Sequence, residues 1–165
     1  MPLFSPQLLI LAETVVRAAA KKKLKIATAE SCTGGLISGC LTAVSGASDV
    51  FDRGFIVYSY ESKTELLGVP RDTIINSGAV STEVAQAMAE GALKNSNADI
   101  VVAVTGIAGP GGGTPGKPVG LVWLGCATKS KCYTRQNNFS GDRSDVRLQT
   151  VETALNVLKT EIEGA

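Results

Sequence analysis

The stretch that decides the fold is Leu24-Lys25-Ile26-Ala27-Thr28-Ala29-Glu30-Ser31-Cys32-Thr33-Gly34-Gly35. It begins with an apolar segment, residues 24–29, and a second apolar segment, residues 36–44, follows it. This order predicts a strand, a tight turn and a helix over residues 33–44. Backbone N–H groups at such a helix start point outward, in a field that favours negative charge. The turn therefore suits a nucleophile with an oxyanion site, or a bound phosphate.

Ser31 and Cys32 are the candidate nucleophiles of this turn. The chain has no histidine, which excludes Ser-His-Asp and Cys-His catalysis and histidine-ligated metals. The base must then be a lysine, a tyrosine or a carboxylate. Structural roles stay open beside catalysis, with Ser31 or Thr33 as a helix N-cap and Cys32 as a small buried apolar residue. A reactive Cys32, whose thiol pKa the helix start lowers, is a further alternative.

The overall composition is that of one globular domain, residues 1–165, with 44% hydrophobic and 19% charged residues. A net charge of +1 and an aromatic content of 5% give no reason to expect the basic face or the aromatic stacking surface that binds nucleic acid. Cysteines at positions 32, 40, 126 and 132 lack the spacing of a zinc site, so we expect no metal and reduced thiols. No segment reads as a secretory leader or a membrane span, which predicts a cytoplasmic protein with no membrane partner.

Hydrophobic periodicity predicts alternating helices and strands along the rest of the chain. Helices are expected over residues 6–23, 62–67 and 81–95 and from residue 142 onward, with Ser5 capping the first and Ser140 or Asp142 the last. Strands are expected over residues 54–58 and 99–104, and as a hairpin of residues 119–127 and 131–139. The continuous apolar run 99–104 is typical of a strand buried in a parallel sheet. The pattern predicts an α/β fold, a three-layer α/β/α sandwich on a mixed sheet.

A glycine-rich segment, Thr105-Gly106-Ile107-Ala108-Gly109-Pro110-Gly111-Gly112-Gly113 and on to Pro118, follows the predicted strand 99–104. Ligands of α/β sheets bind at the carboxyl ends of strands, and glycines let N–H groups approach an anion. We therefore expect Gly106, Gly109 and Gly112 to contact substrate. Residues 111–117 match the start of a P-loop. Pro118 replaces the hydroxyl residue that binds magnesium and a strand follows in place of a helix, which excludes nucleoside triphosphate hydrolysis.

Tyr58, Lys63 and Arg143 are candidates for the same strand-end cleft. Tyr58 ends a predicted strand and Lys63 lies just beyond it, so a buried Lys63 is a possible general base and Tyr58 a proton relay. Arg143 lies in the first turn of the last helix, where the helix dipole disfavours a cation unless it meets an anion. The structural alternatives are a solvated Lys63 and an Arg143 paired with Asp142 and Asp145.

Five motifs together resemble one known family, the C-terminal domain of competence/damage-inducible protein CinA. They are TAESCTGG at 28–35, DRGF at 52–55 before Tyr58-Ser59, GAVS at 78–81, VTGIAGPGGGTPGKP at 104–118 and FSGDR at 139–143. The resemblance extends from near Pro6 to Leu158, and the domain that precedes it in full-length CinA has no counterpart here. It implies a mostly parallel five-stranded mixed sheet, no metal or other cofactor, and a homodimer.

Stand-alone versions of that domain are nicotinamide-nucleotide amidases. The resemblance thus implies hydrolysis of nicotinamide mononucleotide to nicotinate mononucleotide and ammonia, a step of pyridine-nucleotide salvage. Ser31 resembles the nucleophile, Tyr58 and Lys63 resemble its proton-handling partners, and Thr105 and Arg143 resemble residues that shape the substrate site. Tyr60 departs from the family, which usually has asparagine after Tyr-Ser. If that asparagine contacts the substrate amide or orients Lys63, the rate or the specificity of this protein differs from that of the family.

The expected mechanism joins the residue pattern to this resemblance. Ser31, deprotonated by Lys63 with Tyr58 in the relay, attacks the carboxamide carbon, and water then cleaves the acyl-enzyme. The sequence leaves open which of Tyr58 and Lys63 takes the first proton. Two other classes of protein also stay open, a cysteine hydrolase that uses Cys32 and a non-catalytic nucleotide-binding module.

Substrate binding is expected to come from backbone groups and one cation. We expect N–H groups of Cys32, Thr33 and Gly34 to hold the oxyanion. The phosphate is expected to rest on N–H groups of the glycine-rich segment and on Arg143.

Overall fold

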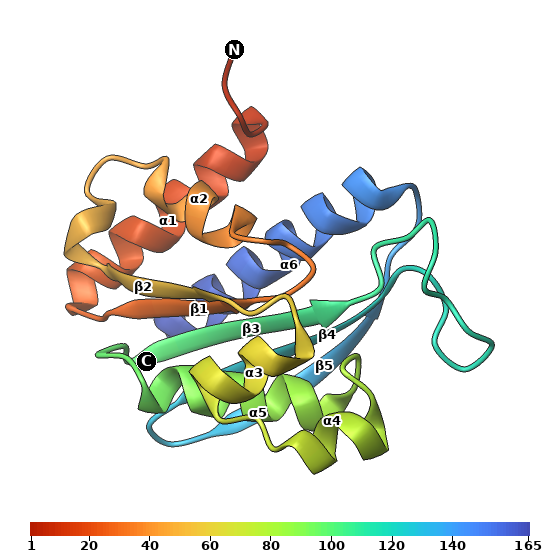
Figure 1. Ribbon diagram of the computed structural model, residues 1–165. Coiled ribbons are helices and arrows are strands. Elements are labelled where there is room, and N and C mark those ends of the chain that lie inside the picture. The colour runs from red at the N-terminus through yellow and green to blue at the C-terminus, as the bar shows by residue number, and fades with distance from the viewer.

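The computed structural model describes residues 1–165 and is built on one five-stranded mixed sheet (Figure 1). The strands are β1 (Ile26–Glu30), β2 (Phe51–Ile56), β3 (Ile100–Gly106), β4 (Leu121–Thr128) and β5 (Cys132–Asn138). Their order across the sheet is β2-β1-β3-β4-β5. β1 is parallel to both β2 and β3, and β4 and β5 extend the sheet as the antiparallel hairpin that the sequence predicts.

Helices cover both faces of the sheet, which confirms the three-layer α/β/α sandwich (Figure 1). One face carries α1 (Pro6–Lys22), α2 (Leu36–Thr42) and α6 (Arg143–Gly164), and the other carries α3 (Tyr60–Leu67), α4 (Arg71–Ser77) and α5 (Thr82–Lys94). A single 3-10 turn, Ala47–Asp49, precedes β2. None of the helices combines the length and apolarity needed to cross a membrane.

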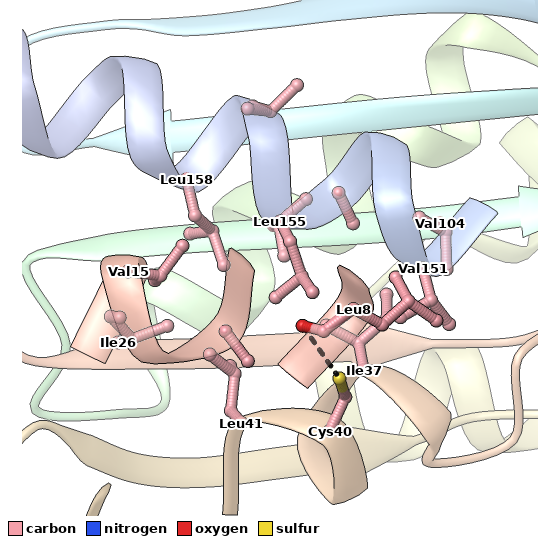
Figure 2. Packing of buried hydrophobic residues seen from close by; sticks show 14 of the residues in the cluster. Leu8, Val15, Ile26, Ile37, Cys40, Leu41, Val104, Val151, Leu155 and Leu158 are labelled. Carbon is pink, nitrogen blue, oxygen red and sulfur yellow. Dashed lines mark hydrogen bonds between the residues drawn. The ribbon is translucent and has the colours of Figure 1, made fainter. Parts of the chain in front are cut away.

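The larger core lies between the sheet and the layer of α1, α2 and α6 (Figure 2). Ile37 and Leu41 of α2 and Leu155 of α6 are fully buried there. Burying one such side chain contributes roughly 1.5–3 kcal/mol. A second core, rich in alanine, lies between the sheet and α5. Small side chains let α5 approach the sheet closely, and a Cβ at Gly125 of β4 would overlap the carbonyl oxygen of Ala85 in α5.

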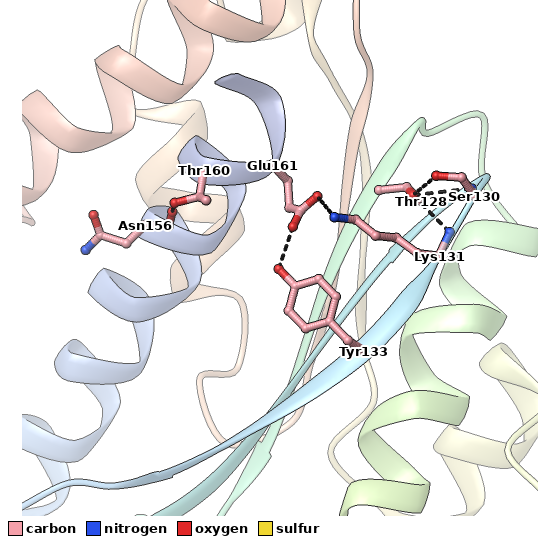
Figure 3. Close-up of polar contacts among 7 residues, drawn as sticks. All are labelled: Thr128, Ser130, Lys131, Tyr133, Asn156, Thr160 and Glu161. Carbon is pink, nitrogen blue, oxygen red and sulfur yellow. Dashed lines mark hydrogen bonds and ion pairs between the residues drawn. The ribbon is translucent and has the colours of Figure 1, made fainter. Parts of the chain in front are cut away.

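A polar cluster ties the edge strand β5 to α6 (Figure 3). The Tyr133 hydroxyl donates to Glu161 Oε1 at 2.8 Å, and Lys131 Nζ lies 3.0 Å from Glu161 Oε2. Burial, followed by the hydrogen bond to Glu161, raises the pKa of Tyr133. This cluster fixes the C-terminal half of α6 and lies apart from the strand ends where a ligand is expected.

The structure differs from the predicted elements at three places. α2 begins at Leu36 and not at residue 33, because Gly34 and Gly35 have φ of 60° and 104°, outside the helical region. β2 spans Phe51–Ile56 and not residues 54–58. It begins earlier because an edge strand tolerates the polar pair Asp52 and Arg53, and it ends before Tyr58. The sequence analysis missed α4, whose seven residues bury only Ile74 and so carry no apolar period.

The chain crosses from one face of the sheet to the other after β2. The connection from β1 to β2 runs through α2 on one face, whereas the connection from β2 to β3 runs through α3, α4 and α5 on the other. The connections thus diverge beyond the carboxyl ends of β1 and β3, which is where open α/β sheets bind their ligands.

Candidate active site

A cavity of about 250 Å³ lies at the carboxyl ends of β1 and β3. The predicted site residues that line it are Ser31, Cys32, Tyr58, Lys63, Thr105, Gly106 and Arg143. Small-molecule pockets typically measure roughly 300–1,000 Å³, so this cavity is at the small end. Three larger hollows, of about 410, 460 and 760 Å³, lie beside the β4–β5 turn, between α1 and α6, and between α3 and α5. None of them contains Ser31 or Lys63, so the smaller cavity is the candidate site.

Ser31 and Lys63 form a buried pair. Ser31 follows β1 directly and is 8% exposed, and Lys63, in the first half of α3, is 1% exposed. Lys63 Nζ lies 3.0 Å from Ser31 Oγ, 2.8 Å from the carbonyl oxygen of Val57 and 3.3 Å from that of Tyr58. The sequence alternative of a solvated lysine is therefore wrong.

The surroundings of Lys63 suit a general base. Burial is the main cause that lowers its pKa, from 10.5 to about 8. A neutral amine has two N–H donors and one lone pair. The protonated amine donates to Ser31 Oγ and to the carbonyl oxygens of Val57 and Tyr58. In the neutral amine, both donors can stay on the two carbonyls and leave the lone pair for the Ser31 hydroxyl. The two carbonyl acceptors thus orient the amine for proton transfer from Ser31.

Cys32 lies beside this pair, but the pKa of its thiol is raised and not lowered. Burial raises the pKa of its thiol from 9.0 to about 12. Its own backbone N–H opposes the rise, Glu30 adds to it, and Arg147 and Lys63 oppose it. The alternative in which the helix start lowers this pKa is therefore wrong, because desolvation of the thiolate outweighs the nearby charges. α2 also begins at Leu36, beyond Cys32.

The turn after Ser31 leaves two backbone donors free. Of the three residues expected to hold an oxyanion, Cys32 lines the cavity, whereas Thr33 and Gly34 do not. Thr33 is fully buried, and the N–H of Gly34 donates to the carbonyl oxygen of Ser31 at 3.2 Å. The N–H groups of Cys32 and Thr33 donate to no other residue. Neither Thr33 nor Ser31 caps α2, since its N-cap is Gly35.

Arg143 points toward the cavity and not toward its acidic neighbours. Its Nη1 donates to the carbonyl oxygen of Gly109 at 2.8 Å, and its Nη2 lies 3.3 Å from the Tyr58 hydroxyl. Asp142 and Asp145 cap the helix start by bonding to each other's backbone N–H. Since both acids are engaged in this capping box, pairing with them does not account for the position of Arg143.

Tyr58 contributes to the site in two different ways. Its carbonyl oxygen accepts from Lys63, whereas its hydroxyl contacts Arg143, and no hydrogen bond joins that hydroxyl to Ser31 or Lys63. Its side chain is 63% exposed. Tyr60, which the resemblance singled out, also lines the cavity and is 61% exposed, so two tyrosines flank its mouth.

Only part of the glycine-rich segment reaches the cavity. Gly106 lines it, and Thr105 supports its wall through a 2.8 Å hydrogen bond from Oγ1 to the carbonyl oxygen of Ala79. Gly109 contributes a carbonyl oxygen to Arg143. Gly112 is exposed in a loop that extends away from the sheet, and it does not line the cavity (Figure 1).

Two residues that the sequence analysis missed hold the turn. Glu30 is fully buried and accepts hydrogen bonds from the turn and from α2, and Arg147 of α6 donates to the carbonyl oxygens of Cys32 and Thr33. One feature of the sequence could have indicated Glu30, namely a glutamate at the end of an otherwise apolar strand. No local signal marks Arg147, which meets the turn only through the packing of α6. No cluster of three or more potential metal ligands occurs in the structure.

The geometry defines an α/β domain with a buried Ser–Lys pair, and the comparisons give its family. A family model described as the CinA C-terminal domain matches residues 9–162. The chain therefore belongs to the CinA C-terminal domain family.

A relative from Caldicellulosiruptor bescii, named a competence-damage inducible protein, is 55% identical over 153 residues, which are 93% of this chain and 37% of that protein. The chain thus spans just over a third of that relative's length. A CinA-like protein from Akkermansia muciniphila is 52% identical over 88% of this chain and 35% of its own length. The crystal structure of competence/damage inducible protein CihA from Agrobacterium tumefaciens is 44% identical, with a TM-score of 0.95 and 99% of both chains covered.

Proposed function

We propose that this protein is an amidohydrolase that converts nicotinamide mononucleotide to nicotinate mononucleotide and ammonia. The observation that carries the proposal is the 3.0 Å contact between Lys63 Nζ and Ser31 Oγ, inside a cavity that also holds Arg143. A serine activated by an adjacent amine is a nucleophile for acyl transfer. The cation suits the phosphate of a mononucleotide. The substrate itself is taken from the resemblance to stand-alone CinA-type amidases.

In the first half of the reaction, Ser31 Oγ attacks the carboxamide carbon while its proton passes to Lys63 Nζ. The carboxamide oxygen takes up the negative charge, and the free N–H groups of Cys32 and Thr33 stabilise it. Lys63 then gives its proton to the amide nitrogen, the C–N bond breaks and ammonia leaves. The product is an ester between Ser31 and the nicotinoyl group.

In the second half, water attacks that ester and Lys63, neutral again, takes a proton from the water. The collapse of the second tetrahedral intermediate returns the proton to Ser31 Oγ and releases the carboxylic acid. We assign the first proton transfer to Lys63, because it contacts Ser31 directly and the Tyr58 hydroxyl is bonded elsewhere. Tyr58 then acts as a wall of the site and a partner of Arg143.

The proposal includes the wider expectations from the sequence, a single domain over residues 1–165 that works in the cytoplasm as a homodimer without a cofactor. Light scattering on the purified protein tests the dimer. The decisive experiment is ammonia release from nicotinamide mononucleotide, with Ser31→Ala as the control. No release by the unaltered protein, together with retained nucleotide binding, would favour a non-catalytic nucleotide-binding module.

A further inference from the structure

Glu30 is a fully buried carboxylate directly before Ser31. It accepts six hydrogen bonds. One comes from Thr28 Oγ1 in the same strand (3.4 Å, to Oε2), and the other five come from the turn after Ser31 and from the start of α2. Among these five, the donors at Oε1 are Thr33 Oγ1 (2.6 Å), Gly35 N (3.2 Å) and Ile37 N (2.9 Å), and those at Oε2 are Ser38 N (3.0 Å) and Ser38 Oγ (2.7 Å).

Burying a glutamate to accept these hydrogen bonds is energetically costly, and the donors require a side chain that accepts at both oxygens. Backbone N–H groups can only donate, so the side chain that receives them must accept at both oxygens. A buried carboxylate is strongly unfavourable unless it is bonded in this way. α2 has only seven residues, and a serine or aspartate N-cap would satisfy the start of a helix without a buried glutamate. The glutamate thus does more than cap α2, because it also fixes the turn from Thr33 to Gly35.

Arg147 holds the other side of the same turn. Its Nε donates to the carbonyl oxygen of Cys32 at 3.1 Å and its Nη2 to that of Thr33 at 3.2 Å. The carboxylate therefore binds donors of the turn and the guanidinium binds acceptors of the turn. Ser31 itself is anchored by its N–H, which donates to the carbonyl oxygen of Val104 in β3 at 3.1 Å.

We propose that Glu30 and Arg147 are positioning residues that hold Ser31 in line with Lys63 and leave the N–H groups of Cys32 and Thr33 free for an oxyanion. Neither residue lines the cavity, so both act through the turn. A displacement of about 1 Å in a reacting group lowers rates by about a hundredfold. The role of these residues in catalysis rests on the proposed function, whereas their hold on the turn does not.

Glu30→Gln tests this role with little change in shape, because the amide nitrogen cannot accept from the N–H groups that face it. We expect kcat for ammonia release from nicotinamide mononucleotide to fall about 10- to 100-fold with KM changed less than about threefold. Hydrogen exchange should quicken at least about tenfold in residues 31–38 and stay unchanged in β3. Tyr133→Phe is the matched control, since it removes a carboxylate hydrogen bond far from the turn and should leave kcat unchanged.

Unchanged exchange in residues 31–38 and native kcat in folded Glu30→Gln would overturn the proposal. Equal loss of protection in β3 would do the same, because the effect would then be general unfolding. If Glu30→Gln does not fold, Arg147→Met decides, with kcat expected to fall and Arg147→Lys expected to recover part of it. A native kcat in folded Arg147→Met would refute the proposal. If the unaltered protein releases no ammonia, the proposed function fails, and hydrogen exchange still decides the positioning role.

Discussion

Lys63 Nζ lies 3.0 Å from Ser31 Oγ, although the two residues are separated by the whole of α2 and β2. Both are buried, and the remaining contacts of the amine are two backbone carbonyl oxygens. In a chain without histidine, this contact is the one direct hydrogen bond between a candidate nucleophile and a candidate base in the cavity. Its consequences for pH dependence and for substitution can be measured.

Activity should rise with pH and level off above about 8. Burial lowers the pKa of Lys63 to about 8, and the base is the neutral amine, so each unit of pH below that value costs about tenfold in kcat/KM. The measurement is kcat/KM for nicotinamide mononucleotide between pH 6 and 10, with stability followed in parallel. Lys63→Met should lose about 10²- to 10⁴-fold in kcat. A flat profile from pH 6 to 8 would contradict the assignment of Lys63 as base.

Ser31→Ala should abolish turnover, whereas Cys32→Ser should keep much of it. The reason is that the Cys32 thiol, with a pKa raised to about 12, stays protonated at neutral pH. Initial rates and thermal melts of both variants check this, because either change leaves a side chain of similar size. An active Ser31→Ala beside an inactive, folded Cys32→Ser would make Cys32 the nucleophile.

Arg143→Ala should weaken the use of nicotinamide mononucleotide much more than that of nicotinamide riboside, which has no phosphate. A charge-assisted contact contributes about 1.5–3 kcal/mol, or about 10- to 150-fold in kcat/KM. Arg143→Lys should recover only part, since an ammonium cannot make the bidentate contact. Equal losses on both substrates would show that Arg143 serves the amide end or only orders Tyr58 and Gly109.

Activity should survive prolonged treatment with a chelator. The side chains of the cavity include no set of three metal-ligating residues, and Lys63 supplies the base. Rates before and after dialysis against EDTA check this, with added zinc and magnesium as controls. Loss of activity that either ion restores would favour a metal-bound hydroxide over Ser31 as the nucleophile.

Gly91→Ala should destabilise the fold. A Cβ at Gly91 of α5 would overlap the main-chain carbonyl of Leu67, which closes α3. Overpacking of this kind costs about 1–3 kcal/mol, and each kcal/mol lowers Tm by about 2–4 °C in a chain of this size. Gly116→Ala is the control, because nothing lies within 4 Å of its Cβ position. Equal Tm values for the two variants would mean that α3 and α5 adjust freely.

The sequence determined the layers of the fold and most of the candidate residues. Apolar periods located five of the six helices and all five strands, because burial of one helix face or of a whole strand leaves a local pattern. The strand–turn–helix around Ser31 was readable for the same reason. α4 was missed because a single buried residue, Ile74, makes no period.

Tertiary structure alone decided how the candidates are used. Whether Lys63 is solvated or buried depends on the packing of α3 on the sheet, and that burial sets its pKa. The same packing raises the pKa of Cys32, although position in the turn had suggested the opposite. Arg147 reaches the turn from α6, over a separation in sequence that no local pattern spans. Local propensity and periodicity depend on residues that are close in sequence. Desolvation and contacts between distant segments exist only once the layers have packed.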